Sequence, residues 1–425
     1  MLDIKFIIEN KDLVQEGINK KGFKGINLDE LISLHQRINS FKTSSQSLRE
    51  EKNRLSNSIK TASAEDRPAI IAKSKELGED LKQEEEELAN LTEQFNAQMM
   101  RMPNLPSPDA PQGKDDTENV VVRKNGEPTK FDFKPLDHVE LMEKNNWADM
   151  ERIAQVCGSR TYAIKNDLAK LELAIHMFVL DKLNEKGFTT ITVPSIIKEK
   201  PLYAVGYLPF AQDEIYYMQA DDVYLSGTAE LVLNSLHADE ILNESDLPIL
   251  YAGFSPCFRR EAGAAGKDTR GLVRVHQFMK TEQFVICKND INESEKWHEK
   301  MLQISEEILQ DLEVPYQVLD VCTGDMGAPK YRQYDLEAWV PSQGVYRETH
   351  SASNITDWQA RRTNLRYREN ADGKVKYAHT LNNTGIATPR ALVPLIENHQ
   401  QADGSVKIPA KLQPYMGGKT VIGGK

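Results

Sequence analysis

Two long runs of residues at alternating three- and four-residue spacing occupy much of the first hundred positions. The first run consists of Leu31, Leu34, Ile38, Phe41, Ser45, Leu48, Lys52, Leu55 and Ile59. After a break at TASAEDRP, the second consists of Ile70, Leu77, Leu81, Glu84, Leu88, Leu91, Phe95, Gln98 and Met102. This spacing places a mainly apolar seam on one face of an α-helix, as in coiled coils. Since one narrow seam cannot build a globular core, the runs predict an antiparallel helical hairpin that projects from the body, with arms of roughly 45 Å.

The charge of this hairpin admits two interpretations. Between Arg37 and Lys75 there are nine basic and four acidic residues, whereas the second run contains the acidic row Glu84 to Glu87. A structural or dimerising coiled coil accounts for the spacing without any ligand. A basic first helix and tip on an otherwise acidic protein also suit a phosphate backbone. The hairpin by itself favours the structural interpretation.

The bulk composition argues against several classes of protein. The 425 residues carry a formal net charge of −11, so any contact with nucleic acid must be local. No run of about 18 apolar residues occurs, and the N-terminal MLDIKFIIENKD has early acids and no cleavable apolar core. The four cysteines include no CxxC pair and are typical of buried thiols. We expect a cytoplasmic globular protein that does not associate with a membrane.

Beyond the hairpin, the chain changes character twice. Residues 103–131 are rich in proline and turn residues and predict a linker between an N-terminal domain, 1–102, and a C-terminal domain, 132–425. Residues 167–186 show the apolar spacing of a helix. The strand that follows contains Pro194, which cannot donate to a ladder, so we expect it at a sheet edge or an interface. Several later strand-like runs adjoin directly, which predicts an α+β domain with a largely antiparallel sheet flanked by helices.

The stretch CFRREAGAAGKDTRGLVRVHQFMKTE, at 257–282, carries an unusual set of polar residues. It predicts two strands joined by a mobile, glycine-containing loop. Because side chains alternate along a strand, Arg259 and Glu261 should share one face. The residues expected to share a face of the second strand are Arg274, His276, Phe278, Lys280 and Glu282. Such a wall suits a nucleotide and a small zwitterion better than an apolar core. The chain has no GxGxxG after a strand and no GxxxxGK[ST], so a nucleotide would not be held as in Rossmann or P-loop proteins.

Three further segments carry unusually placed polar residues. GTAE at 227–230 precedes a helix-like run, for which a helix cap is the plain interpretation. In YRETHSASN, Glu348 and Ser351 could share a divalent ion, although such residues are usually solvated. In LNNTGIATPR, Asn382 and Thr384 are expected before a helix and Arg390 near its start, where an arginine opposes the helix dipole.

In order and spacing, these segments resemble the class II aminoacyl-tRNA synthetases and, more closely, the bacterial-type seryl-tRNA synthetases. The Pro194 strand resembles the first motif of the class, which lies at the dimer interface. FRRE with the loop to VRVHQF resembles the second motif, and GIATPR before a helix resembles the third. The hairpin, the linker, TAE, EAGAAGKDTRGL and LNNTG also fall where that family has them, so the resemblance extends nearly to PYMGG near the end of the chain.

The resemblance implies an enzyme that uses ATP and Mg²⁺ to attach L-serine to tRNA(Ser) through a seryl-adenylate, as a homodimer whose hairpin reaches the tRNA. It leaves open whether tRNA(Sec) is also charged. The residues that it assigns to ATP are Arg259, Arg260, Glu261, Arg274, Phe278, Glu348, Thr349, His350, Ser351 and Arg390. Those that it assigns to serine are Thr228, Ala229, Glu230, Glu282, Asn382 and Thr384. Arg259 and Arg390 would be catalytic, and Glu348 and Ser351 would hold the magnesium ion.

Rival functions make different demands on the sequence. Truncated carrier-protein ligases of the same class lack the long arm, and a catalytically dead relative would have lost an arginine or a carboxylate of the wall. A coiled-coil adaptor leaves the wall unexplained. A threonine-specific synthetase would be expected to bring zinc ligands, and the sequence has no Cys/His cluster. We interpret His276 and His350 as structural strand residues and not as general bases.

Overall fold

The computed structural model describes residues 1–264, 266, 268 and 270–424. Three residues of the predicted 262–272 loop, Ala265, Lys267 and Thr269, lie outside the described residues. The chain divides into two compact units. One comprises Leu2–Asn19 and Phe23–Met102, and the other comprises Met1, Lys20–Gly22 and Pro103–Lys425.

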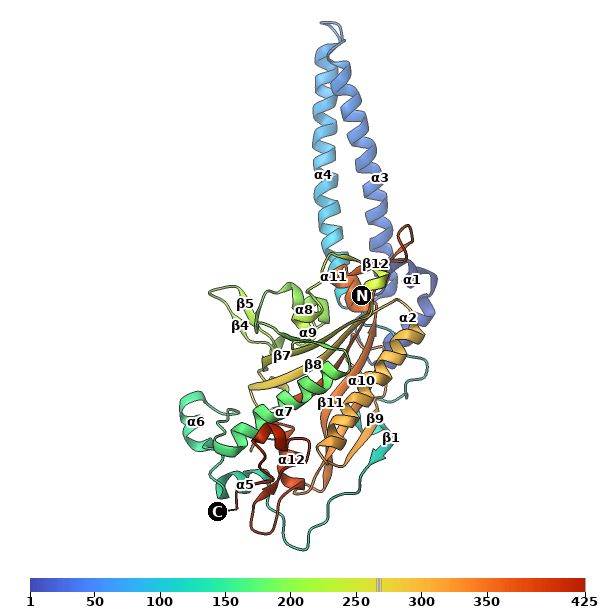
Figure 1. Cartoon of the computed structure of the whole chain (residues 1–425). Coiled ribbons are helices and arrows are strands. Elements are labelled where there is room, and N and C mark those ends of the chain that lie inside the picture. The colour runs from blue at the N-terminus through green and yellow to red at the C-terminus, as the bar shows by residue number, and fades with distance from the viewer. Residues whose placement is uncertain (265, 267, 269, 425) are drawn as a thin grey trace. The chain divides into compact units, whose positions relative to one another are not determined.

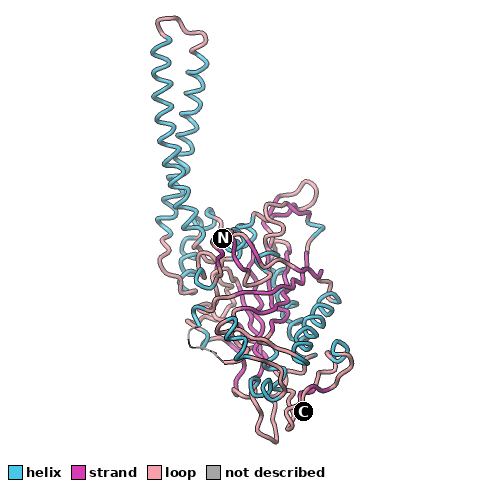
Figure 2. Tube along the Cα trace, turned by 90° about the vertical axis from the view of Figure 1, so that its left-hand side faces the viewer, coloured by secondary structure: helices cyan, strands magenta, loops and turns pink. Residues whose placement is uncertain are grey.

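The first unit is dominated by a helical hairpin. Its helices are α1 (Ile4–Glu9), α2 (Lys11–Lys20), α3 (Leu28–Ser58) and α4 (Arg67–Met100). Helices α3 and α4 lie side by side up to a loop at the tip (Figures 1 and 2). The predicted seam lies between them, with Leu34, Ile38 and Leu91 buried against Phe41, Leu88 and Phe95. The hairpin prediction is therefore confirmed.

Polar contacts explain the opposite charges of the two arms. The Arg37 guanidinium lies 3.0 Å from the Glu87 carboxylate, and the Arg49 guanidinium lies 2.7 Å from that of Glu85. The acidic row of α4 thus pairs with basic residues of α3. Within the seam, the hydroxyl of the buried Ser45 donates to Glu84 over 3.0 Å.

The second unit is built on an eight-stranded sheet. The strands, in spatial order, are β1 (Val120–Asn125), β9 (Tyr316–Asp320), β10 (Arg332–Val340), β11 (Val345–Thr356), β14 (His379–Thr388), β8 (Gln277–Cys287), β7 (Ile249–Phe258) and β2 (Thr189–Thr192). All neighbours pair antiparallel except β2 with β7. The predicted, largely antiparallel sheet is confirmed. Strand β2, just before Pro194, lies at the sheet edge, and β1 comes from the segment predicted as a linker.

Two long helices cover one face of this sheet, and the candidate site lies on the opposite face. Helices α7 (Asn166–Glu185) and α10 (Ile291–Asp311) lie across the strands in Figure 1, and their apolar residues join Val285, Leu381 and Ile386 in the main core. Alternation then separates neighbouring side chains. Gln283 and Asn383 bond to Met301 and Ser305 of α10, whereas Glu282 and Asn382 face the other side.

Short elements complete the unit. The remaining helices are α5 (His138–Lys144), α6 (Met150–Cys157), α8 (Lys200–Val205), α9 (Glu230–Leu233), α11 (Trp358–Thr363) and α12 (Leu392–Asn398). The small sheets have the orders β13 (Val375–Tyr377), β12 (Arg366–Arg368), β6 (Ile241–Asn243); β3 (Ile196–Ile197), β5 (Val223–Leu225), β4 (Tyr217–Met218); and β15 (Val406–Lys407), β16 (Val421–Ile422). Within the described residues, no helix is both long and apolar enough to cross a membrane.

Candidate active site

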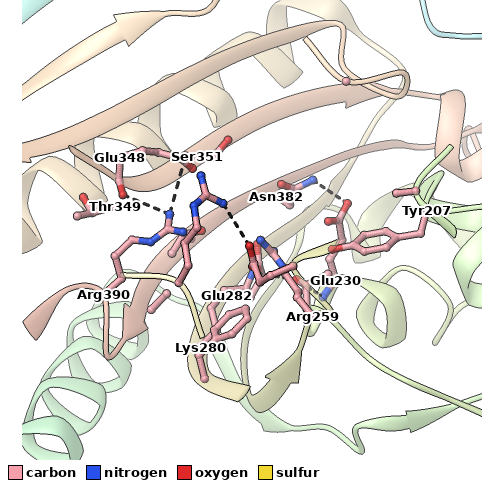
Figure 3. Close-up of a pocket in the computed structure, with 18 of the residues that line it drawn as sticks. Tyr207, Glu230, Arg259, Lys280, Glu282, Glu348, Thr349, Ser351, Asn382 and Arg390 are labelled. Atoms are coloured by element: carbon pink, nitrogen blue, oxygen red, sulfur yellow. Dashed lines mark hydrogen bonds and ion pairs between the residues drawn. The ribbon is translucent and has the colours of Figure 1, made fainter. Parts of the chain in front are cut away.

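A cavity of about 430 Å³ lies on the face of the sheet opposite α7 and α10. The predicted residues that line it are Thr228, Glu230, Arg259, Glu261, Arg274, Phe278, Glu282, Glu348, Thr349, Ser351, Asn382, Thr384 and Arg390. Figure 3 shows Glu348 and Arg390 at one end, Asn382 and Glu230 at the other, and Arg259 and Glu282 between them. Segments distant in sequence thus form one site with a cationic end and a hydrogen-bonding end.

Three predicted residues do not reach the cavity. Among the described residues, Ala229, Arg260 and His350 are not part of its lining. Ala229 is fully buried beneath it, and the Arg260 side chain is exposed. His350 is buried: its Nε2 lies 2.9 Å from the Gly385 carbonyl, and burial lowers its pKa to about 4. A neutral, internally bonded imidazole fits the structural interpretation of His350.

Several polar residues of the 257–282 stretch lie just beyond the strands and not within them. Strand β7 ends at Phe258, before Arg259, and β8 begins at Gln277, after Arg274. Glu261 has a φ of 53°, so strand alternation does not explain its direction. The prediction that Arg259, Glu261, Arg274 and His276 are strand residues was wrong, because the ladder gives way to the loop at these positions. The alternation argument holds inside β8, where Phe278, Lys280 and Glu282 all line the cavity.

Three arginines, Arg259, Arg274 and Arg390, line the cavity. The Arg259 guanidinium lies 5.2 Å from the centre of the Phe278 ring, and its Nε is buried without a partner in the described part of the chain. The pKa of Arg259 is raised by the charge interaction with Tyr207, with burial acting in the opposite direction. Arg274 contacts Glu261 and Asp268, each over 3.2 Å. Together the arginines suit a polyanion such as a triphosphate.

Arg390 forms hydrogen bonds to the main chain of two separate segments, the one before β8 and strand β11. Its Nε donates to the Val273 carbonyl over 3.1 Å, and its Nη1 donates to the Glu348 carbonyl over 3.4 Å. Burial lowers the pKa of Arg390. Asn382 and Thr384 lie within β14, which precedes α12, and α12 begins two residues after Arg390.

A β-bulge aligns the two predicted magnesium ligands. Residues three apart on a regular strand point to opposite faces. In β11, however, Glu348 pairs with Glu337 and His350 with Leu336, so Thr349 is an extra residue. Glu348 and Ser351 therefore both face the cavity. A carboxylate and a hydroxyl are hard oxygen donors, so these residues fit a Mg²⁺ ion that also binds phosphate.

The buried carboxylate of Asp335 lies next to the predicted magnesium ligand Ser351. Asp335 is opposite Ser351 in the ladder, and both share Gln333 Nε2 as a hydrogen-bond donor, over 2.9 and 3.1 Å respectively. Burial and the neighbouring Glu348 raise the pKa of Asp335 to about 7.

The hydrogen-bonding end is built on Glu282, whose side chain is almost fully buried. Its Oε2 accepts from the Thr228 hydroxyl over 2.9 Å and lies in direct contact with the Lys280 ammonium group. Burial raises the pKa of Glu282, and the charge of Lys280 acts in the opposite direction. Nearby, Glu230 Oε1 accepts from Asn382 over 2.8 Å and from Gln359 over 2.7 Å. These groups can form hydrogen bonds to a small molecule that has an ammonium and a hydroxyl group.

Three residues with no predicted role belong to the site: Lys280, Lys330 and Gln359. Lys280 lines the cavity two residues from Glu282, and it had been placed on the same face by alternation. Lys330 also lines the cavity and donates to Ser353. Gln359 contacts the site by donating a hydrogen bond to Glu230. For Lys330 and Gln359, no local pattern in the sequence marks the contact.

Known proteins are similar to this chain in both sequence and fold. Residues 1–106 match the family model "Seryl-tRNA synthetase N-terminal domain", and residues 213–399 match "tRNA synthetase class II core domain (G, H, P, S and T)". Serine–tRNA ligase of Deinococcus radiodurans is 50% identical over 423 residues, which cover 100% of this chain and 99% of the relative.

Two solved structures are similar over their whole length. The seryl-tRNA synthetase of Pyrococcus horikoshii complexed with ATP has a TM-score of 0.92 and 41% identity, covering 100% of this chain and 99% of that one. The cytoplasmic serine–tRNA ligase of Naegleria fowleri in complex with AMP has a TM-score of 0.87 and 29% identity, with the same coverage.

The antiparallel sheet and the matching core domain define a class II aminoacyl-tRNA synthetase. The identity to full-length relatives narrows the class further. The chain belongs to the seryl-tRNA synthetase family.

Proposed function

We propose that this enzyme attaches L-serine to tRNA(Ser) in two steps that share the cavity. In the first step, the serine carboxylate attacks the α-phosphorus of ATP, a P–O bond forms, and pyrophosphate leaves. In the second, a hydroxyl of the terminal ribose of tRNA attacks the carbonyl carbon of seryl-adenylate, and AMP leaves. The observation that carries the proposal is a cluster of three arginines, Arg259, Arg274 and Arg390, beside the buried Thr228–Glu282 pair.

The arginines act on charge and position. Arg259, which lines the cavity, holds the α-phosphate and the serine carboxylate, and it stabilises the charge that develops at phosphorus. Arg274 and Arg390 hold the γ-phosphate. Phe278 stacks on the adenine, and Glu261 accepts from the adenine amine. No covalent enzyme intermediate is required.

Glu348 and Ser351 would hold Mg²⁺ together with the phosphates. When bound, the ion neutralises phosphate charge during the transfer. The bulge at Thr349 supports this role, since it directs both oxygen donors to one face of β11.

Serine is selected by its hydroxyl and ammonium groups. Glu282 and Thr384 take the hydroxyl, while Thr228 and Glu230, with Asn382, hold the ammonium end. Alanine and glycine lack the hydroxyl and would leave the buried Glu282 without this partner, a penalty that can reach about 10⁴-fold in kcat/KM.

The remaining assignments concern the molecule outside the cavity. We assign tRNA binding to residues 1–102, through the hairpin, and catalysis to residues 132–425, with 103–131 between them. Homodimerisation, a cytoplasmic location and the charging of tRNA(Sec) stay predictions.

Serine-dependent exchange of pyrophosphate with ATP tests the proposal. We expect exchange with serine, and Arg259→Ala should lower its rate about 10²- to 10³-fold because a transition-state contact is lost. Arg37→Ala, which removes an exposed arginine of the hairpin, is the matched control and should leave exchange unchanged. Absence of exchange with serine, or equal exchange with threonine, would overturn the assignment.

A further inference from the structure

His138, at the first position of α5, makes three contacts that the proposed reaction does not use. Its side chain is nearly buried, and the Glu397 side chain, in the last turn of α12, is fully buried. Glu397 Oε1 accepts from the His138 backbone N–H over 2.9 Å and lies 3.0 Å from its Nδ1. On its other side, His138 Nε2 lies 3.3 Å from the backbone nitrogen of Leu272. Helices α5 and α12 are neighbours in Figure 1.

These contacts define which ring nitrogen carries the proton. The Leu272 N–H can only donate, so Nε2 must be the acceptor and must lack a proton. Nδ1 then carries the hydrogen and donates it to Glu397. Glu397 is itself held from another direction, because its Oε2 accepts from the Ser342 N–H over 3.0 Å. The imidazole is thus fixed between a buried carboxylate and the main chain of the 262–272 loop.

The contacted segment carries ATP-site residues. Leu272 is fully buried and is followed by Val273, whose carbonyl accepts from Arg390, and by Arg274. Arg390 lies two residues before the start of α12, and Glu397 lies in the last turn of this helix. The main chain at 272–273 is therefore held both by the residue that leads into α12, directly through Arg390, and by its last turn, through His138 and Glu397.

Two neighbouring residues fit the same attachment. Gly271 has a φ of 82°, and a Cβ there would overlap His138 Nε2. The Arg270 guanidinium lies 2.6 Å from Asp137, the residue before His138. The chain thus approaches the start of α5 closely over residues 270–272, and only glycine fits at 271.

We propose that His138 is a positioning residue for ATP: it transmits the fixed orientation of Glu397 to the Leu272 main chain and so sets the place of Arg274 and of the Val273 carbonyl. This inference rests on the assignment of ATP to the cavity. Exchange by the unsubstituted enzyme tests that assignment separately.

Two substitutions divide the functions of the imidazole. In His138→Gln, the amide oxygen can replace Nε2 as the acceptor for Leu272, while the bond from Nδ1 to Glu397 is lost. In His138→Asn, the amide nitrogen can replace Nδ1 as the donor to Glu397, while Leu272 loses its acceptor. We expect Asn to raise KM for ATP about tenfold and Gln to leave it within about twofold, because a buried N–H without an acceptor is costly. KM for serine should change little in either variant.

A role in stability alone predicts the reverse order. The Asn variant keeps the bond to the fully buried carboxylate, so it would be the milder of the two in thermal unfolding and in activity. Equal KM values for ATP in the two variants, or a larger rise in Gln, would overturn the proposal.

Gly271→Ala provides a second approach that leaves His138 and Glu397 intact. The added methyl group displaces Leu272 from His138, so the same selective rise in KM for ATP is expected. In the double variant with His138→Asn, the second substitution should add little, since both remove one contact. A fully additive effect, or a rise in KM for serine of equal size, would contradict the positioning role.

Discussion

Lys280 and Glu282 lie two residues apart on β8 and form an ion pair whose two side chains are almost completely buried. Two opposing effects act on Glu282, because burial raises its pKa and the ammonium group of Lys280 lowers it. The ionised carboxylate is the form that accepts hydrogen bonds from both Thr228 and a serine hydroxyl. Lys280 therefore favours the accepting state of Glu282, to which we assign the serine hydroxyl.

Lys280→Met should shift the pH dependence of serine activation. Without the ammonium group, the pKa of Glu282 rises further, so the accepting form is lost at a higher pH as the solution is acidified. We expect the acid limb of kcat/KM for serine to move to higher pH, with activity near neutral pH falling about tenfold. The profile is measured by pyrophosphate exchange between about pH 5.5 and 9.

Lys280→Arg is the control for this prediction. It retains the charge and should leave the acid limb near its original position, although the larger group can lower the rate. An unchanged limb in Lys280→Met would show that Lys280 does not control the ionisation of Glu282. KM for ATP should be unaffected in both variants.

Local periodicity in the sequence predicts some residues of the site, whereas contacts across the fold leave no such signal. Alternation along β8 correctly grouped Phe278 with Glu282, since it depends only on local geometry. It failed at Glu261, where a positive φ turns the chain. Lys330 and Gln359 enter the site through contacts across the fold, for which a single sequence contains no periodic signal.

At the scale of elements, a glycine of β7 supports the hydrogen-bonding end of the cavity. Gly253 lies opposite Glu282 in the ladder. A Cβ at this position would lie 2.7 Å from Leu233 Cδ1 and 3.0 Å from Ala229 Cβ. Ala229 is the middle residue of the TAE segment, so Gly253 lets the turn with Thr228 and Glu230 pack directly on the strand.

Gly253→Ala should therefore raise KM for serine more than KM for ATP. The overpacked methyl group displaces the TAE turn at a cost of about 1–3 kcal/mol, and a shift of about tenfold in KM for serine is expected. Exchange kinetics with each substrate varied in turn provide the measurement. Gly78→Ala is the control, since its Cβ would meet only the end of the Lys52 side chain in the hairpin. Equal increases in both KM values would indicate a general disturbance of β7.

The elements differ in how far the sequence predicts them. The seam spacing predicted α3 and α4 to within a few residues, because a hairpin is stabilised by repeating local contacts. The site residues of β14 were expected before a helix, and the sequence did not assign them to a strand. The place of β14 between β11 and β8 depends on partners distant in the sequence, and the segment has no alternating polar pattern because both of its faces are buried.

At the scale of the whole molecule, the two units separate the cavity from the hairpin. Every residue that lines the cavity belongs to the unit that contains Pro103–Lys425. The base of the hairpin is closed, since Gln98 donates to Glu30 over 2.9 Å. A short glycine linker can therefore replace residues 32–96 without stretching the chain.

This deletion should leave serine-dependent pyrophosphate exchange nearly intact and abolish charging of tRNA(Ser). Exchange uses only the cavity, whereas charging needs the tRNA, which we assign to the hairpin. Aminoacylation with labelled serine measures the second activity. Retained charging at the rate of the full chain would make the hairpin a structural element only.

The strand order also has a consequence for folding. Strands β7 and β8 are consecutive neighbours, as are β10 and β11, so each pair can form early from nearby residues. The first pair supplies Phe278 and Glu282, and the second supplies Glu348 and Ser351, but the two become one sheet only when β14 inserts between β11 and β8. Neither of these two strand pairs contains a complete substrate site. The substrates therefore cannot guide the early stages of folding, and a newly made chain acquires affinity for ATP and serine only when this last long-range pairing is complete.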